Sequence, residues 1–230
     1  MMRVKFYFDI GSLQSWILFE QLIAVERCFN IRPEFTPVRA SVLYTLTGAR
    51  NPYYVLPIRQ YVFNEVDRMR ELYGVPFDVP QDAERKLSTT GTVPAQHFLT
   101  RLQIEHPNRL KEASRFLWRR LWVQQGDVHR DEDFETILRE LALPSNSISA
   151  VPDVQTETKL KSAESEVVEH GGYAVPFVVL QKKDESVKTF IGMDSWPLIA
   201  KQLELPAAQR TFYGLRSFNH LFDRTDALPV

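Results

Sequence analysis

The chain has 230 residues, of which 44% are hydrophobic, enough for a packed core. Its 28 basic and 29 acidic side chains nearly cancel, and no run of Lys or Arg suggests a surface that binds nucleic acid. No apolar stretch approaches the roughly 20 residues of a membrane-spanning helix, so no membrane span is expected.

Cys28 is the single cysteine of the sequence. The chain therefore cannot form an internal disulfide and has no Cys-x-x-Cys redox pair. Its 5 histidines are scattered without cysteine or carboxylate partners at ligand spacing, so no metal site is expected. Any thiol chemistry would need a thiol supplied by another molecule.

The first elements in chain order predict a β-α-β unit. Residues 4–10 have the composition of a strand, residues 15–29 carry apolar side chains at helical spacing, and residues 31–38 predict a second strand. Strands joined in this way normally pair in parallel. Between the first strand and the helix, the sequence FDIGSLQSW breaks at Gly11 and places Ser12 at the start of the helix.

The next part of the chain is helical in character throughout. Five segments with helical periodicity follow one another, separated by glycine and proline. They lie at residues 57–74, 94–106, 108–125, 131–143 and 154–170. We expect an all-helical insert without strands.

After the insert, residues 175–180 and 188–192 predict the two strands of a hairpin, and residues 194–203 predict a capped helix. The order β-α-β, helices, β-β-α indicates an α/β protein with a thioredoxin-like fold and an inserted all-helical domain, the DsbA-like topology. Residues 1–56 and 171–230 would form the discontinuous thioredoxin-like domain, and residues 57–170 the inserted domain. The tail from Leu205 has no clear assignment.

Six segments of the sequence resemble, in order, the kappa class of glutathione transferases, a family related to DsbA-type proteins. FYFDIGSLQSW resembles the family's Phe-Tyr-Asp followed by Ser-Pro-Tyr-Ser-Trp. NPYYVLP, FLTRLQIEHP and ASRFLWRRLW resemble segments of its helical insert, and YAVPFVV and IGMDSW resemble its cis-proline loop and the start of its last helix. The resemblance covers residues 4–204 approximately. The family also includes bacterial 2-hydroxychromene-2-carboxylate isomerases.

This resemblance implies an enzyme that uses glutathione as co-substrate and no metal. The implied activity is conjugation of the glutathione thiol to a small electrophile, or reduction of an organic peroxide, by a homodimer that acts in detoxification. Two alternatives stay open: a glutathione- or peptide-binding protein with little catalysis, and a glutathione-dependent isomerase of aromatic substrates.

The same resemblance implies the mitochondrion or the peroxisome as the location. However, we see no targeting segment ahead of the first strand, and Leu228-Pro229-Val230 does not match the peroxisomal Ser-Lys-Leu signal. A cytoplasmic location therefore stays open as well.

Ser12 is the predicted catalytic residue, because the family's thiolate-stabilising serine is the first serine of its motif. A free thiol with a pKa of about 8.5 is only a few per cent ionised at neutral pH. Lowering this pKa by about two units takes about 2.7 kcal/mol. A hydrogen bond to the thiolate, worth about 1.5–3 kcal/mol, and a helix N-terminus, worth about 0.3–1 kcal/mol, can supply it. The alternative is that Ser12 or Ser15 only caps the helix.

The resemblance also implies a set of residues that bind glutathione. They are Ser12, Gln14, Asn51, Arg59, Val175, Pro176, Met193 and Asp194. Val175 would offer its backbone to the tripeptide from a cis-proline loop; the alternative is a trans bond at the start of an ordinary strand. Asp194 would bind the ligand's amino group beside the free N–H groups of the last helix, or would merely cap that helix.

Arg59 stands where the family usually has a lysine and could bind the glycine carboxylate of glutathione. Asn51 could be a turn residue before Pro52 instead of a ligand contact. Leu13 and Gln14 replace the family's proline and tyrosine, and Met193 replaces a serine. These departures change the pocket that the resemblance implies for the electrophile.

Overall fold

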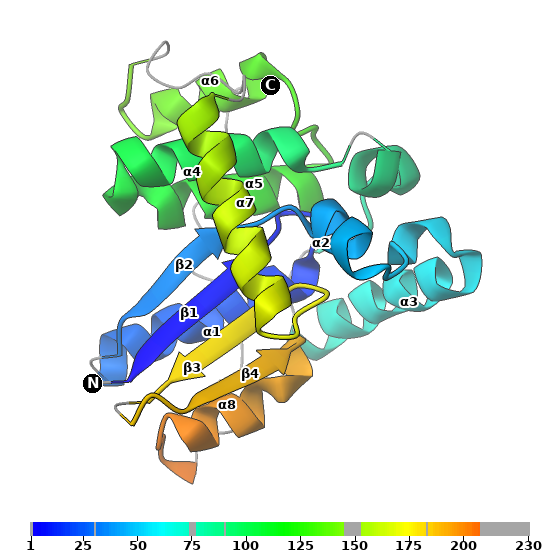
Figure 1. The fold of residues 1–230 in the computed structure, drawn as a ribbon. Helices are drawn as coiled ribbons and strands as arrows, with labels where there is room; N and C mark the ends of the chain where they lie inside the picture. Colours follow the sequence, from blue (N-terminus) through cyan, green and yellow to red (C-terminus); the bar gives the residue numbers. More distant parts are fainter. Residues whose placement is uncertain are drawn as a thin grey trace.

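The computed structural model describes residues 2–29, 31–73, 77–89, 91–144, 153–182 and 184–207. A mixed sheet of four strands lies at its centre, in the order β2-β1-β3-β4 (Figure 1). The central strand β1 (Arg3–Phe8) pairs in parallel with β2 (Pro33–Pro37) and antiparallel with β3 (Phe177–Gln181). β3 in turn pairs antiparallel with β4 (Val187–Ile191), which completes the predicted hairpin.

The register of the sheet follows from its composition. Phe6 on β1 pairs with Phe35 on β2 and with Val178 on β3, so large apolar side chains meet across the central strands. β2 both begins and ends with proline, which donates no ladder hydrogen bond. Its position at the edge of the sheet accommodates this loss.

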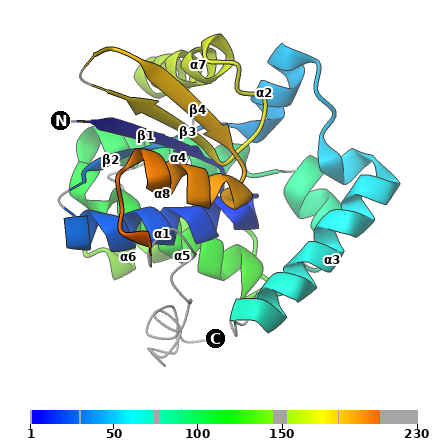
Figure 2. The same ribbon diagram turned by 90° about the horizontal axis from the view of Figure 1, so that it is seen from below.

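Helices cover both faces of the sheet. Figure 2 shows α1 (Leu13–Phe29) and α8 (Trp196–Gln202) on one face, with α7 (Val154–Glu169) on the other. α2 (Ala40–Thr47) packs beside α7, where Leu43 joins Val167 and Phe177 in one apolar cluster.

The predicted helical insert is confirmed in its element order. The helices are α3 (Leu56–Tyr73), α4 (Val93–Glu105), α5 (Leu110–Trp122) and α6 (Asp131–Glu140), followed by α7. Short turns supplement them: η1 (Pro52–Tyr54), η2 (Arg85–Thr89), η3 (Pro107–Arg109) and η4 (Met193–Ser195). α7 falls inside the predicted insert yet packs on the sheet, so the division into domains at residues 57 and 170 stays a prediction.

Three details differ from the sequence-based expectation. α2 was not predicted at all; it is a short helix that ends at Gly48, whose φ of 72° suits glycine. β3 begins at Phe177, because Val175 and Pro176 form a loop with a cis peptide bond. The last helix begins with the 3₁₀ turn η4, and Leu205 is buried against the core while the tail from residue 208 lies outside the described residues.

The core joins the insert to the sheet through tryptophan. Trp16 on α1 and Trp118 on α5 are fully buried and stack with their ring centroids 6.0 Å apart. Trp122, also fully buried, donates its indole N–H to the carbonyl oxygen of Ile10 at 2.9 Å. This hydrogen bond fixes the chain just after β1 against α5.

Candidate functional site

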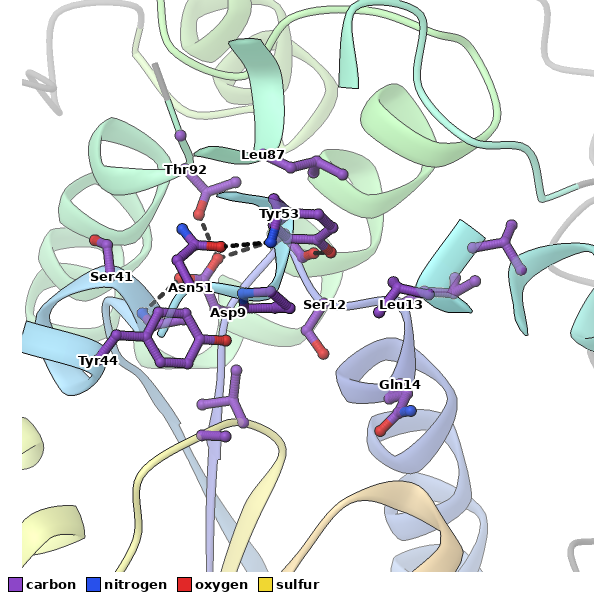
Figure 3. Close-up of a pocket in the computed structure, with 18 of the residues that line it drawn as sticks. Asp9, Ser12, Leu13, Gln14, Ser41, Tyr44, Asn51, Tyr53, Leu87 and Thr92 are labelled. Carbon is purple, nitrogen blue, oxygen red and sulfur yellow. Dashed lines mark hydrogen bonds between the residues drawn. The ribbon is translucent and has the colours of Figure 1, made fainter. Parts of the chain in front are cut away.

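A cavity of about 460 Å³ lies where β1 ends and α1 begins (Figure 3). Its lining comes from the turn between these two elements, from α2, η1 and α3, from the start of α4, and from the loop before β3. Polar side chains on its wall include Ser12, Tyr44 and Asn51. The buried part of the wall formed by α3 and η2 is apolar, with Val66, Met69 and Leu87, while Tyr61 and Glu65 of α3 add polar groups to the lining.

Ser12 lines this cavity and caps α1 at the same time. Its Oγ accepts a hydrogen bond from the Ser15 N–H at 3.1 Å, and its carbonyl accepts from the Trp16 N–H at 3.3 Å. Ser15 itself lies within α1 and is buried, so it is not the cap. A hydroxyl that accepts one bond still has its own proton to donate. Figure 3 shows the Ser12 hydroxyl between the side chains of Tyr44 and Gln14, which also line the cavity.

Gln14 and Val175 also line the cavity. The Val175–Pro176 peptide bond is cis, and Pro176 is buried behind it. Asp194 is exposed at the start of η4 and outside the cavity lining. It makes no side-chain capping bond to η4 or α8.

Gly192 holds the segment of Asp194 close to the site. Its N–H donates to the Pro176 carbonyl at 3.0 Å, and its φ is 81°. A Cβ atom at residue 192 would lie 2.4 Å from Oδ1 of Asp194 and 3.8 Å from Oε1 of Gln14. The cis-proline loop, the start of α1 and the start of η4 therefore converge beside the cavity.

The remaining predicted site residues are placed as follows. Asn51 lines the cavity. Its Oδ1 also accepts a hydrogen bond from the Tyr53 N–H at 2.9 Å, so Asn51 stabilises the turn before Pro52 as well. Arg59 does not line the cavity; its Nη1 forms an ion pair with Glu84 at 2.6 Å. Met193 is half-buried and also lies outside the lining.

Asp9 is the principal site residue that the sequence reasoning missed. Its carboxylate is 4% exposed and accepts hydrogen bonds from the Gly11 N–H at 2.8 Å and from the Ala40 N–H at 2.9 Å. It also accepts bonds from the Thr92 hydroxyl and from Nε2 of Gln96, the latter at 3.1 Å. Burial raises the pKa of Asp9, and these four bonds oppose that rise. The carboxylate thus ties together the turn before Ser12, the start of α2 and the start of α4.

Two tyrosines complete the polar wall. Tyr53 on η1 donates its hydroxyl proton to the Gly11 carbonyl at 2.9 Å, and burial raises its pKa. Tyr44 on α2 is half-buried, and its hydroxyl makes no hydrogen bond to any residue that the structure describes. Burial, aided by the charge of Asp9, raises the pKa of Tyr44 to about 12.

The residues that were not predicted differ in how far their local sequence indicated a place in the site. Asp9 directly follows the buried strand β1, at the strand end where α/β folds commonly place their sites. Thr92 stands before the helix start Val93-Pro94, a common capping position. Tyr44 gave no signal, because α2 itself was not predicted.

The chain's own thiol is far from the cavity. Cys28 is exposed in the last turn of α1, whereas Ser12 precedes its first turn, and the rise of a helix puts the two about 24 Å apart. Within the described ranges, no three His, Cys, Asp or Glu side chains are placed to hold a metal ion. No helix in the same ranges is long and apolar enough to cross a membrane.

Comparison with known proteins agrees with this architecture. Glutathione S-transferase kappa 1 of Rattus norvegicus is 24% identical over 201 residues, covering 86% of this chain and 88% of the relative. A solved structure of 2-hydroxychromene-2-carboxylate isomerase superposes with a TM-score of 0.71 at 12% identity, over 88% of this chain and 94% of that one. The cytosolic disulfide reductase DsbM from Pseudomonas aeruginosa, solved with GSH, has a TM-score of 0.63 at 12% identity, over 96% and 99% of the two chains.

The model of the DSBA-like thioredoxin domain matches residues 3–204. This range contains the sheet, the helical insert and every residue of the cavity wall. It confirms the thioredoxin-like fold with a helical insert that the sequence predicted. The chain therefore belongs to the family of DSBA-like thioredoxin domains.

Proposed function

We propose that the protein is a glutathione transferase similar to the kappa class, and that Ser12 stabilises the thiolate of bound glutathione. The observation that carries the proposal is the position of Ser12. Its hydroxyl lines the cavity, and its Oγ accepts a hydrogen bond from the Ser15 N–H, which leaves the hydroxyl proton for a ligand. A hydroxyl held in this way can donate its proton to sulfur without reorienting. The first backbone N–H groups of α1 add a partial positive charge at the same place.

The surroundings of Ser12 support the same proposal. The backbone of Val175 borders the cavity at a cis-proline loop, where an extended tripeptide can bind as an additional short strand. Asp194 lies close to Gly192, beside that loop, and supplies a carboxylate for the amino group of the γ-glutamyl residue. Arg59 pairs with Glu84 and would have to leave this partner to bind a carboxylate of glutathione.

The proposed second substrate is a small electrophile or an organic peroxide in the apolar part of the cavity. Leu13 lines the cavity where the kappa class has proline, and Val66, Met69 and Leu87 contribute further apolar surface. With a carbon electrophile, the thiolate forms a carbon–sulfur bond and the leaving group departs with its electron pair. With an organic peroxide, the thiolate attacks one oxygen, the O–O bond breaks and an alcohol leaves, and a second glutathione reduces the resulting sulfenic acid to glutathione disulfide and water. Neither these steps nor glutathione binding require a metal.

Replacement of Ser12 by Ala tests the proposal. We expect Ser12→Ala to raise the pKa of the bound thiol towards about 8.5, measured by a titration of thiolate absorbance, and to cut conjugation about 10- to 100-fold at neutral pH. Ser15→Ala is the matched control, since Ser15 lies on the same helix but outside the cavity lining. Unchanged turnover in Ser12→Ala would refute the assigned role.

Calorimetry with glutathione separates this proposal from the binding-protein alternative. Binding without turnover of any electrophile or peroxide would favour the alternative, which rests on Leu13, Gln14 and Met193. Conversion of an aromatic substrate without consumption of glutathione would indicate an isomerase.

We further propose that the protein acts as a homodimer. Tyr54, Leu56 and Ile58 follow one another around η1 and the start of α3, and they are 62%, 58% and 44% exposed. Leu46 on the neighbouring α2 is 56% exposed. Contiguous exposed apolar patches mark protein interfaces, and we propose that these four side chains form one.

A further inference from the structure

Tyr44 is a second hydroxyl that faces the cavity, and the proposed function does not yet use it. It lies on α2, on the wall opposite α1, and Figure 3 shows its hydroxyl directed into the same open space as that of Ser12. Within the described part of the chain this hydroxyl has no hydrogen-bond partner, whereas the hydroxyl of Tyr53 is engaged by Gly11. Tyr44 can therefore donate to a ligand without breaking an existing bond.

Two buried contacts fix the start of α2, the helix that carries Tyr44. The Ala40 N–H, one turn before Tyr44, donates to Oδ2 of Asp9 at 2.9 Å. Arg39, 7% exposed, forms a two-pronged ion pair with Glu164 on α7 through Nε at 2.7 Å and Nη2 at 2.8 Å. These contacts hold the first turn of α2 against Asp9 and α7, and so fix the backbone that presents Tyr44 to the cavity.

The protonation state of Tyr44 suits a donor. Burial and the nearby charge of Asp9 raise its pKa to about 12, so the hydroxyl keeps its proton at neutral pH. The negative charge of Asp9 disfavours ionisation of the Tyr44 hydroxyl, so Tyr44 can donate a hydrogen bond to a negatively charged ligand atom and keep its proton.

We propose that Tyr44 is a catalytic residue that donates a hydrogen bond to the electrophile, at an oxygen atom on which negative charge develops when glutathione attacks. The inference rests on the proposed function. It names the substrate class: electrophiles with an apolar body, which fits against Val66, Met69 and Leu87, and with an acceptor oxygen near the reacting carbon. Nitroarenes and α,β-unsaturated carbonyl compounds have this form.

The chemistry can be followed on a chlorodinitrobenzene. The thiolate sulfur supplies an electron pair for the new carbon–sulfur bond, and a ring electron pair moves onto the nitro oxygens, which gain the negative charge. Tyr44 donates a hydrogen bond to one of these oxygens and retains its proton. The charge then returns to the ring, the carbon–chlorine bond breaks, and chloride leaves with its electron pair.

The test compares two electrophiles in Tyr44→Phe. With 1-chloro-2,4-dinitrobenzene we expect kcat to fall about 10- to 100-fold, because a hydrogen bond to a charged oxygen exists only after attack. With benzyl chloride, which has no acceptor oxygen, we expect a change of less than about threefold. The pKa of the bound glutathione thiol should stay at its wild-type value. Tyr173→Phe, on an exposed tyrosine outside the cavity lining, is the control.

Each other outcome has a definite meaning. An equal loss of kcat with both electrophiles, or a raised thiol pKa in Tyr44→Phe, would place Tyr44 at the sulfur or in a structural role and overturn the inference. Unchanged kcat with the nitroarene would overturn it as well, while the proposed function would stand on the wild-type activity. A wild-type protein that neither binds glutathione nor turns over either electrophile would overturn the proposed function itself.

Discussion

Replacement of Asp9 by Asn would test whether the buried carboxylate organises the site. Asn has the size of Asp but puts an NH₂ group where one carboxylate oxygen stood. All four groups bonded to Asp9 donate hydrogen, so the amide nitrogen must face a donor in either orientation. In one orientation the Ala40 N–H loses its acceptor; in the other, Gly11, Thr92 and Gln96 lose theirs.

The expected loss of stability follows from the less costly orientation. A hydrogen bond to a charged group contributes about 1.5–3 kcal/mol, and an unpaired buried donor costs about 1–3 kcal/mol. Relief from burying a charge offsets part of this sum, which leaves a net loss of about 3 kcal/mol. In a protein of this size such a loss lowers the melting temperature by about 6–12 °C, measurable by circular dichroism.

Asp133→Asn is the matched control for Asp9→Asn. Asp133 on α6 is also 4% exposed and accepts from the Arg130 N–H at 3.1 Å, but it does not line the cavity. Both variants should be less stable than the wild type, whereas only Asp9→Asn should raise KM for glutathione, since only Asp9 holds the turn that carries Ser12. A melting temperature of Asp9→Asn within about 2 °C of wild type, or an equal rise of KM in Asp133→Asn, would refute this reasoning.

Two further predictions concern acid stability and assembly. Burial opposes ionisation of Glu157, but hydrogen bonds from His97 and Arg39 outweigh it and hold the pKa of Glu157 below its ordinary value of 4.5. Its ion pair therefore stabilises the fold fully above pH 4.5, and this contribution is lost as pH falls through the lower folded-state pKa. In thermal melts between about pH 5 and about pH 3, the melting temperature of Glu157→Gln should therefore fall less than that of the wild type. An equal fall in the melting temperature of both proteins would contradict this. Leu56→Arg should convert the proposed dimer to a monomer in light-scattering measurements, because it places a charge among Leu46, Tyr54 and Ile58; an unchanged mass would exclude this surface as the interface.

Those parts of the fold with strong local periodicity could be predicted from the sequence. The strand before Ser12, the helix after it and the five helices of the insert each have apolar side chains spaced for one type of element. α2 escaped because it has only eight residues, of which one is buried, so its sequence has no clear periodicity. The cis form of the bond before Pro176 was expected only from family resemblance, because nothing in the local sequence distinguishes it.

The site was predictable to the extent that its residues act through their own segment. Ser12 is presented by the turn in which it lies, and Val175 by the loop before β3. The environments of Arg59 and Asp9 instead depend on distant residues: Glu84 pairs with Arg59, and Thr92 and Gln96 bond to Asp9. Such partners are set by tertiary packing, which local patterns do not encode.

The hydrogen bonds of Asp9 also bear on the order in which the protein can fold. Their donors lie 2, 31, 83 and 87 residues further along the chain. During synthesis the first strand, with its helix and α2, emerges well before α4. Until α4 arrives, a buried Asp9 would lack two of its donors and be costly, so this half of the sheet should stay open. The cavity can then close only after α4 has docked, and its last wall, the loop before β3, is made later still.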